Sequence, residues 1–261
     1  MEYEYLSRIL SGYQKLGGAG AAGHARADVQ GRTRIPDWAI AALRPVADGT
    51  SPIRAVIHPL GFTCLPMERA GLSGVCVHLW SPRVARTEPT TSPVHAHSWR
   101  LTSYALFGTL ENRLMRITDT DGVLPGAGDT ETGAGAVSRT SAVSADPAIR
   151  RLVEVRSRGD ADELVPTWRL VRCQAAQCQR IQPGDVYSMP AGAFHRTDVA
   201  PGAEAVTVAL GTMVAGIRDC SLGPLDSTRH EIRRRACDAE QTAAAARIVL
   251  DRLRPPSRRV A

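Results

Sequence analysis

The sequence predicts an all-β protein, a barrel or sandwich of short strands, with a helical segment before it and a helix after it. From about Ile53 onward, short runs rich in β-branched residues are separated by glycine and proline, which is typical of strands joined by turns. Near the C-terminus the apolar residues change to a helical spacing. The chain has 261 residues, 43% of them apolar, so it can bury a sizeable core.

Residues 1–52 are expected to form an accessory helical segment. Glu2 to Lys15 favour a short helix that ends at Gly17 and Gly18. A loose Gly/Ala/Arg stretch follows. Pro36 then begins a second helix through Leu43, because proline suits a first helical turn.

Residues 53–218 are expected to form the barrel. Residues 120–148 are mostly Gly, Ala, Ser, Thr and Asp without apolar periodicity, which predicts a flexible insertion. Many short strands at close spacing favour a barrel or a sandwich. The strands expected here are Arg54–Ile57, Val75–Trp80, Val94–Trp99, Ser103–Phe107, Leu110–Ile117, Arg151–Val155, Thr167–Cys173, Cys178–Ile181, Val186–Met189 and Ala205–Gly211.

Residues 219–261 are expected to form a C-terminal helix and a basic tail. Thr228 and Glu231 match a capping box, and Pro255 and Pro256 stop the helix. This helix either packs on the barrel or forms the seam of a homodimer. Its apolar stripe, spaced by four and three, is Ile232, Ala236, Ala239, Ala243, Ala246, Leu250 and Leu253.

The charge is concentrated in this last segment. The formal net charge is +6, and residues 227–261 hold nine arginines against four acids. The arginines are not interleaved with aromatic residues and no helix-turn-helix pattern is evident, so we expect no nucleic-acid partner. No apolar run approaches the roughly 20 residues that cross a bilayer, and the N-terminus lacks the apolar region of a signal peptide. These features, with six cysteines and no C-x-x-C pair, predict a cytoplasmic protein with reduced thiols and no membrane association.

Two histidines on one expected strand give the first functional signal. Side chains alternate between the faces of a strand, so His95 and His97 point the same way. Imidazole suits first-row divalent metals.

A second signal runs from Gly184 to His195. Pro190 ends a strand, Gly192 permits a positive φ in the next turn, and His195 re-enters on a neighbouring strand.

These residues resemble the two cupin motifs. Gly184, Pro190, Gly192 and His195 match the second motif, G-x5-P-x-G-x2-H, without gaps. His95 and His97, followed by Gly108, resemble the first motif, H-x-H-x3-E-x6-G. The likeness extends over roughly residues 55–215. It implies a cupin-type β-barrel, the double-stranded β-helix or jelly roll, that holds one divalent metal ion on His95, His97 and His195.

The sequence departs from the first motif at its carboxylate. The position of the motif glutamate is Leu101, or Thr102 with a loop one residue longer, and Pro89 replaces the leading glycine. The common set of three histidines and one glutamate is therefore excluded at those positions. A set of three histidines remains.

Three neutral ligands leave the ion its full charge and open positions for substrate or dioxygen. Among cupins, the thiol (cysteine) dioxygenases are similar: three histidines, Fe(II) and no glutamate. The resemblance implies an Fe(II) dioxygenase with O2 as co-substrate and a small organic molecule as substrate. The enrichment in alanine and arginine is typical of a GC-rich bacterial genome, and we expect a role in bacterial specialised metabolism. The Ser-x-His-x-Tyr run of cysteine dioxygenase is replaced by Val208, Leu210 and Thr212, which predicts an apolar wall and a more lipophilic substrate.

Five further residues are candidates for the site. Arg100 or Arg113 would pair with a substrate carboxylate, and Tyr187 would donate a hydrogen bond. Trp99 and Phe194 would form walls of the cavity. We interpret the remaining histidines as structural or surface residues, although His78 alternates with Cys76 and Trp80 and could thereby face the interior; these histidines are His24, His58, His78 and His230.

Other functions remain open. A non-redox metal cupin, an isomerase, lyase or hydrolase, would use Zn, Ni or Mn as a Lewis acid. A ligand-binding or regulatory cupin is motivated by the basic C-terminal segment. A 2-oxoglutarate oxygenase is disfavoured, because that chemistry uses Asp or Glu two residues after the first histidine, where this chain has His97.

Overall fold

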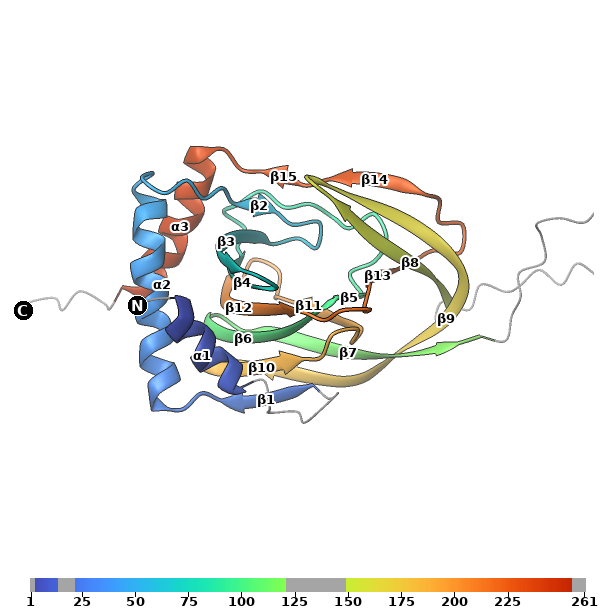
Figure 1. Cartoon of the computed structure of the whole chain (residues 1–261), viewed down its shortest axis with the longest axis horizontal. Helices are drawn as coiled ribbons and strands as arrows, with labels where there is room; N and C mark the ends of the chain where they lie inside the picture. The colour runs from blue at the N-terminus through green and yellow to red at the C-terminus, as the bar shows by residue number, and fades with distance from the viewer. Residues whose placement is uncertain (1–2, 14–21, 121–148, 255–261) are drawn as a thin grey trace, which may run out of the picture.

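The computed structural model describes residues 3–13, 22–120 and 149–254. The protein is mostly β, with two large antiparallel sheets, and the described residues form three helices (Figure 1). The all-β expectation is therefore confirmed at this level. The insertion expected at 120–148 lies, apart from Thr120, outside the described residues. Within the described ranges no helix is long and apolar enough to cross a membrane.

The first sheet has eight strands and lies against the helices (Figure 1). In spatial order its strands are β1 (Gly23–Arg26), β10 (Asp185–Met189), β6 (Trp99–Phe107), β12 (Ala205–Met213), β4 (Ser73–Trp80), β3 (Thr63–Ala70), β2 (Val56–Ile57) and β15 (Arg235–Ala236).

The second sheet has seven strands, and an additional pairing of β8 with β9 joins strands from its two ends. Six of its strands thus form a closed circuit of pairings. In spatial order the strands are β14 (His230–Arg233), β9 (Ala161–Ile181), β7 (Leu110–Asp119), β11 (His195–Asp198), β5 (His95–Ala96), β13 (Asp219–Gly223) and β8 (Ile149–Arg158).

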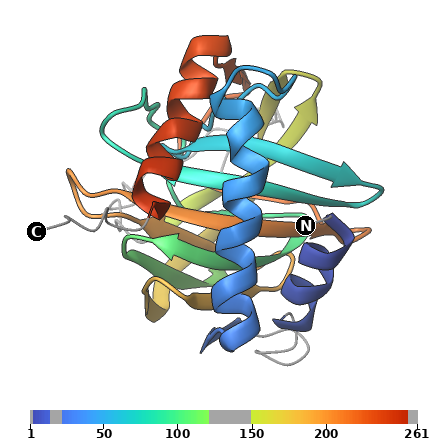
Figure 2. The same ribbon diagram turned by 90° about the vertical axis from the view of Figure 1, so that its left-hand side faces the viewer.

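Three helices cover the outer face of the first sheet (Figure 2). They are α1 (Tyr3–Tyr13), α2 (Val29–Ala47) and α3 (Ala239–Leu253). Leu6, Leu43 and Val249 from these helices are fully buried against the sheet. The sheet supplies β-branched and leucine side chains at every second position, so this layer forms the largest apolar core.

The opposite face of the first sheet meets the second sheet in a smaller core, which we call the inter-sheet core. Its buried members are Trp80, Leu101, Ala105, Leu110, Ile181, Tyr187, Met189, Ala205 and Ala209. Along each central strand, alternate side chains point into one core or the other. On β12, Val206, Val208 and Leu210 face the helices, whereas Ala205 and Ala209 face the second sheet.

Both longer helices begin at residues other than those predicted. The second helix begins at Val29 after the N-cap Asp28, and Pro36 lies inside it. The C-terminal helix begins at Ala239, where Asp238 and Gln241 form the capping box, and not after Thr228. Residues 230–233 and 235–236 are strands instead, because their backbone N–H and C=O groups find hydrogen-bond partners by pairing with β9 and β2.

Several strand boundaries also differ. The single strand expected over Val94–Trp99 is interrupted after Ala96, and the two strands expected at Thr167–Cys173 and Cys178–Ile181 are one long strand. The strand β3 was not expected, because Pro66 interrupts its pattern; that proline lies at a register shift in the pairing with β4.

The sheets cross both boundaries that the sequence predicted for the barrel. β1 lies before residue 53 and pairs with β10. β13 lies after residue 218 and pairs with β5 and β8, so 219–261 is not only helix and tail.

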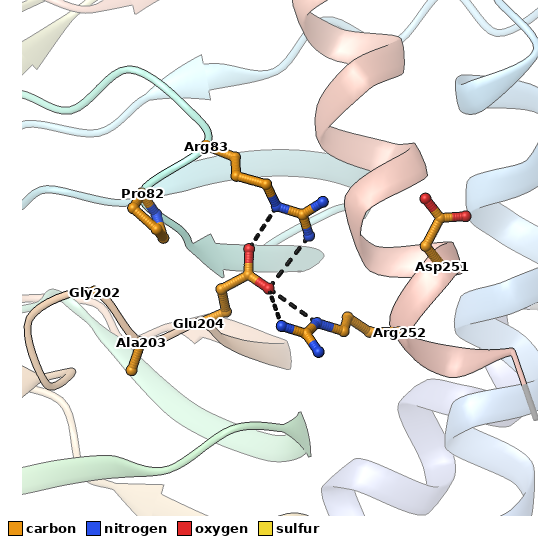
Figure 3. A pocket seen from close by; sticks show the side chains of 7 residues that line it. All are labelled: Pro82, Arg83, Gly202, Ala203, Glu204, Asp251 and Arg252. Atoms are coloured by element: carbon orange, nitrogen blue, oxygen red, sulfur yellow. Dashed lines mark hydrogen bonds and ion pairs between the residues drawn. The ribbon is translucent and has the colours of Figure 1, made fainter. Parts of the chain in front are cut away.

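A buried carboxylate ties α3 to the loops of the first sheet (Figure 3). The Glu204 side chain is 8% exposed, and it accepts hydrogen bonds from Arg83, Arg252 and Ser81. These interactions, above all the hydrogen bond from Arg83, lower the pKa of Glu204 to about 2. The hollow around this cluster contains none of the predicted metal ligands, so we interpret it as a structural contact.

Candidate metal centre

Strand register brings His95 and His195 together. β11 pairs with β5 so that His195 lies directly opposite His95. Directly opposed residues of antiparallel strands have Cβ atoms about 5 Å apart, so both imidazoles emerge side by side. His97 follows two residues after His95, just beyond the end of β5. The ring centroids of His95 and His195 are 4.3 Å apart, and those of His97 and His195 are 5.1 Å apart.

The donor atoms of these three histidines, which we call the triad, fit one metal ion. Their candidate nitrogen atoms all lie within 4.8 Å of one another. The Nε2 atoms of His95 and His97 are 3.1 Å apart. Two metal–nitrogen bonds of about 2.1 Å at a right angle would place the nitrogens about 3 Å apart. The triad can therefore hold a metal ion without rearrangement of this pair.

Backbone carbonyls set the orientation of two rings. Nδ1 of His95 lies 2.9 Å from the carbonyl oxygen of Pro93, and Nδ1 of His195 lies 3.0 Å from that of Ala193. A carbonyl only accepts, so each Nδ1 donates its proton and each Nε2 keeps a lone pair for a metal. This is the usual supporting shell of histidine ligands.

Burial keeps the triad neutral. His195 is 3% exposed, and burial lowers its pKa to about 4. Burial, followed by the proximity of the other imidazoles, also places the pKa values of His95 and His97 well below their ordinary value. Neutral imidazole is the form that binds a metal.

His97 lies just after β5, outside the strand pairing, and contacts with neighbouring residues fix the position of its ring. Its carbonyl accepts a hydrogen bond from the Gly192 amide, 2.8 Å long. Its ring stacks on Trp99 with centroids 4.2 Å apart and planes 12° apart. A Cβ at Gly211 would lie 3.2 Å from Cδ1 of Trp99, so the absence of a side chain there makes room for the indole.

The glycines of the two motifs have the conformation that their positions require. Gly108, Gly184 and Gly192 all have positive φ, at 76°, 83° and 80°. Pro190 follows the last residue of β10, and His195 begins β11, as the sequence predicted. The turn between them delivers His195 to the strand beside His95.

No carboxylate belongs to the donor group. Among the described residues, His95, His97 and His195 are the only His, Cys, Asp or Glu side chains in this cluster. Leu101 faces the inter-sheet core and Thr102 is on the opposite side of its strand. Neither position can supply the anionic ligand that the first cupin motif normally carries.

Tyr187 lies in the inter-sheet core among polar side chains. It is 3% exposed, and burial raises its pKa, while Ser103, Asn112 and Thr207 act in the opposite direction. Oγ of Ser103, Nδ2 of Asn112 and Oγ1 of Thr207 are buried around the Tyr187 hydroxyl, and within the described part of the chain they have no other hydrogen-bond partner. These three side chains and the Tyr187 hydroxyl form a buried polar cluster in the inter-sheet core.

The other predicted helpers lie elsewhere. Arg113 is exposed and pairs with Glu111 at 3.1 Å and Asp198 at 3.6 Å. Arg100 is also exposed, on the strand face opposite to Leu101. Phe194 packs in a separate cluster around Leu152, Val171 and Leu222. We therefore remove both arginines and Phe194 from the candidate site.

The apolar wall predicted from Val208 and Leu210 is also wrong. Both side chains face the helices. The residues of β12 that share the inner face are Thr207, Ala209 and Gly211, because they alternate with the helix-facing positions.

A second cluster of donor atoms was missed. Cys64, Cys76 and His78 have donor atoms within 4.8 Å of one another. Contact with Cys64, with a further contribution from His78, lowers the pKa of Cys76 to about 5, while the same contact and burial raise that of Cys64. The alternation of Cys76 with His78 was visible in the sequence, but the position of Cys64 opposite His78 required the register of an unexpected strand.

The basic C-terminal segment uses several of its arginines internally. Arg229 pairs with Glu163, Arg234 with Asp162, and Arg252 with Glu204.

All six cysteines are free thiols, with no disulfide between them.

Comparisons with known proteins add little. No family model matches the chain, and no curated protein matches it. The chain is similar to the X-ray structure of E. coli ycfD at 11% identity and a TM-score of 0.34, with 83% of this chain and 54% of that chain covered. The chain thus spans about half the length of that protein, and a likeness this low carries no inference about fold or function.

Proposed function

We propose that the chain is a cupin-type metal enzyme that uses Fe(II) and O2 to oxygenate a small organic molecule. The observation that carries this proposal is the donor set: three neutral imidazoles converge and no carboxylate joins them. Such a set resembles the facial ligands of non-haem iron oxygenases with one anionic ligand fewer. The jelly-roll interpretation is supported by the two facing antiparallel sheets and by the motif glycines at their turns.

The charge of the site favours an anionic substrate group. Three neutral ligands leave a divalent ion with its full +2 charge in a buried position, where electrostatic attraction is strong. When bound, the iron would supply the activation of dioxygen. The chain's own residues would hold the imidazoles in place, exclude bulk water and orient the substrate.

Two sets of side chains support a substrate with polar and apolar parts. Tyr187, with Ser103, Asn112 and Thr207 around its hydroxyl, offers hydrogen bonds inside the inter-sheet core. Met213 and Ile217 are exposed apolar residues near Trp99 and Gly192 respectively. We propose that the polar group would give a substrate its orientation and that the apolar rim would accept its hydrocarbon part.

The proposal is tested by anaerobic loading with Fe(II) followed by O2 uptake in the presence of small carboxylates, thiols and phenols. We expect substrate-dependent O2 consumption that is lost in His195→Ala and retained in Arg100→Ala. Equal O2 uptake by the wild type and His195→Ala would contradict the proposal. So would the absence of uptake across the panel from a chain shown to hold iron on the triad.

A non-redox metal enzyme is the second candidate. Three histidines with an open position are also the donor set of zinc sites that activate water. Elemental analysis after purification without an affinity tag discriminates the two. Zinc, nickel or manganese retained on the triad, together with hydrolytic or isomerase activity, would favour this candidate over the oxygenase.

A further inference from the structure

Cys64, Cys76 and His78 are brought together on the inner face of two paired strands. Cys64 on β3 lies directly opposite His78 on β4, and Cys76 lies opposite Pro66, one step along the same face. Leu65, Val75 and Val77 alternate with them and face the helices. The two sulfurs and one imidazole nitrogen therefore converge on the side of the sheet that faces the inter-sheet core.

The surroundings are aromatic. The ring of His78 lies 4.7 Å from that of Phe62 and 6.1 Å from that of Trp80, measured between centroids. Phe62 is in turn stacked on His58 at 4.3 Å. Cys64, Cys76 and His78 are each partly exposed, so an ion can reach them.

The geometry suits a metal ion better than a disulfide. The two cysteines are diagonal neighbours across the ladder, and such positions are typically about 7–8 Å apart. A disulfide needs Cβ atoms about 3.5–4.5 Å apart. A tetrahedral ion with metal–sulfur bonds of about 2.3 Å holds its sulfurs about 3.8 Å apart. The observed limit of 4.8 Å between all three donors accommodates that separation.

We propose that Cys64, Cys76 and His78 form a second metal site, one for a thiophilic d10 cation such as Zn²⁺ or Cu⁺. Thiolate ligands select these ions, whereas the triad offers nitrogen alone. Two thiolates cancel the charge of Zn²⁺, and three protein ligands leave a fourth tetrahedral position for water or another ligand. The chain would then hold two different ions.

The two sites border the same core. Phe62 and Trp80 contact His78, and Trp99 stacks on His97 of the triad. Trp80 belongs to the inter-sheet core, and Phe62 and Trp99 pack against it. The proposal does not depend on what the triad catalyses. It concerns only which ions the chain holds and where.

Cobalt(II) distinguishes the sites by spectroscopy. Thiolate ligands give cobalt an intense near-ultraviolet charge-transfer absorption, and histidine ligands do not. Reduced, metal-free full-length chain titrated with Co²⁺ is expected to develop this absorption, and Zn²⁺ is expected to abolish it by displacement. Cys64→Ser and Cys76→Ser should lose the band and weaken Zn²⁺ binding more than about 100-fold, since even outer-shell changes cost 10–100-fold.

Two controls separate this site from the triad and from thiols in general. His95→Ala should keep the thiolate band, and so should Cys220→Ser, which removes a partly buried thiol in another cluster. Circular dichroism verifies the fold of each variant. Absence of the band in the folded, reduced wild type would overturn the proposal, as would its persistence in Cys64→Ser.

A measurement on the wild type covers the case in which the cysteine variants do not fold. One further Zn²⁺ or Cu⁺ ion should be bound beyond the triad metal, and its binding should protect two thiols from alkylation. Titration with Zn²⁺ and, under anaerobic conditions, with Cu⁺ identifies which ion is held more tightly. Full alkylation of Cys64 and Cys76 with saturating Zn²⁺, and again with saturating Cu⁺, would contradict the site.

Discussion

At the scale of single residues, the candidate site could be predicted wherever a motif constrains the backbone. His95, His97 and His195 converge as predicted, because the turn with Pro190 and Gly192 leaves few ways to reach the neighbouring strand. Side chains at positions that the motifs leave unspecified could not be placed. Arg100 and Val208 were assigned to the site, but period-2 alternation gives two faces without telling which one is inside.

Removal of the indole beside His97 should weaken metal binding. Trp99→Ala leaves the ring of His97 without its stacking partner, so we expect the affinity of the triad for Ni²⁺ or Fe²⁺ to fall about 10–100-fold while the fold is retained. Isothermal titration measures the change. Trp168→Ala is the matched control, since that indole is 86% exposed, and an equal loss in both variants would refute a positioning role for Trp99.

The glycine that directly follows β6 should not tolerate a side chain. Gly108 has φ of 76°, and a Cβ there would lie 2.0 Å from the carbonyl oxygen of Glu204. Gly108→Ala should therefore lower the free energy of unfolding by more than about 2 kcal/mol, beyond the 1–2 kcal/mol of a left-handed alanine alone. Urea unfolding is the measurement.

Gly159→Ala supplies the comparison for this effect. Gly159 has φ of 61° with nothing within 4 Å of the added Cβ, so only the conformational cost of about 1–2 kcal/mol is expected. If the two variants lose equal stability, then the contact between the added Cβ at position 108 and the Glu204 backbone does not destabilise the fold.

At the scale of elements, the sequence predicted that helices flank a β region but misplaced where they begin. Asp28 and Asp238 cap the helices, whereas the local pattern predicted that they begin at Pro36 and at Thr228. For α3 the start was decided by distant partners, because the residues before it form β14 and β15, which pair with β9 and β2. Such pairings join residues far apart in the chain, and local propensity does not contain them.

The two candidate caps of the C-terminal helix can be compared directly. Asp238→Ala removes the side chain that accepts from the Gln241 amide at 2.7 Å, so we expect a loss of about 1 kcal/mol in the free energy of unfolding. Thr228→Ala changes an exposed residue of a loop and should cost less than about 0.5 kcal/mol. The reverse order would indicate that α3 begins at Thr228.

At the scale of the whole molecule, the helices, the first sheet and the second sheet are three layers held by two cores. The sequence predicted the β-rich class but not the closed circuit of strands in the second sheet, because closure depends on the pairing of β8 with β9 across a long hairpin. The Glu204 cluster joins α3 to this assembly through Arg252 and Arg83.

Acid should weaken this contact. Contacts with Arg83, Ser81 and Arg252 lower the pKa of Glu204 from 4.5 to about 2. Because the folded pKa lies below the unfolded one, its contribution is complete above about pH 4.5 and is lost as the pH falls towards 2. We expect Glu204→Gln to be less stable than the wild type by about 1–3 kcal/mol near neutral pH. As the pH falls from about 4.5 towards 2, the variant should lose less stability than the wild type.

Urea unfolding at a series of pH values measures this effect. Glu88→Gln, a change at an exposed glutamate, should follow the wild type throughout. An unchanged acid dependence in Glu204→Gln would show that this carboxylate does not join α3 to the sheet energetically.

The most direct measurement for the central claim is an anomalous diffraction map of crystals grown with Fe(II) or Ni(II). We predict a metal peak about 2.1 Å from nitrogen atoms of His95, His97 and His195 and from no protein carboxylate, and the loss of that peak in His195→Ala. Absence of a peak between the three rings, or its persistence without His195, would contradict the account.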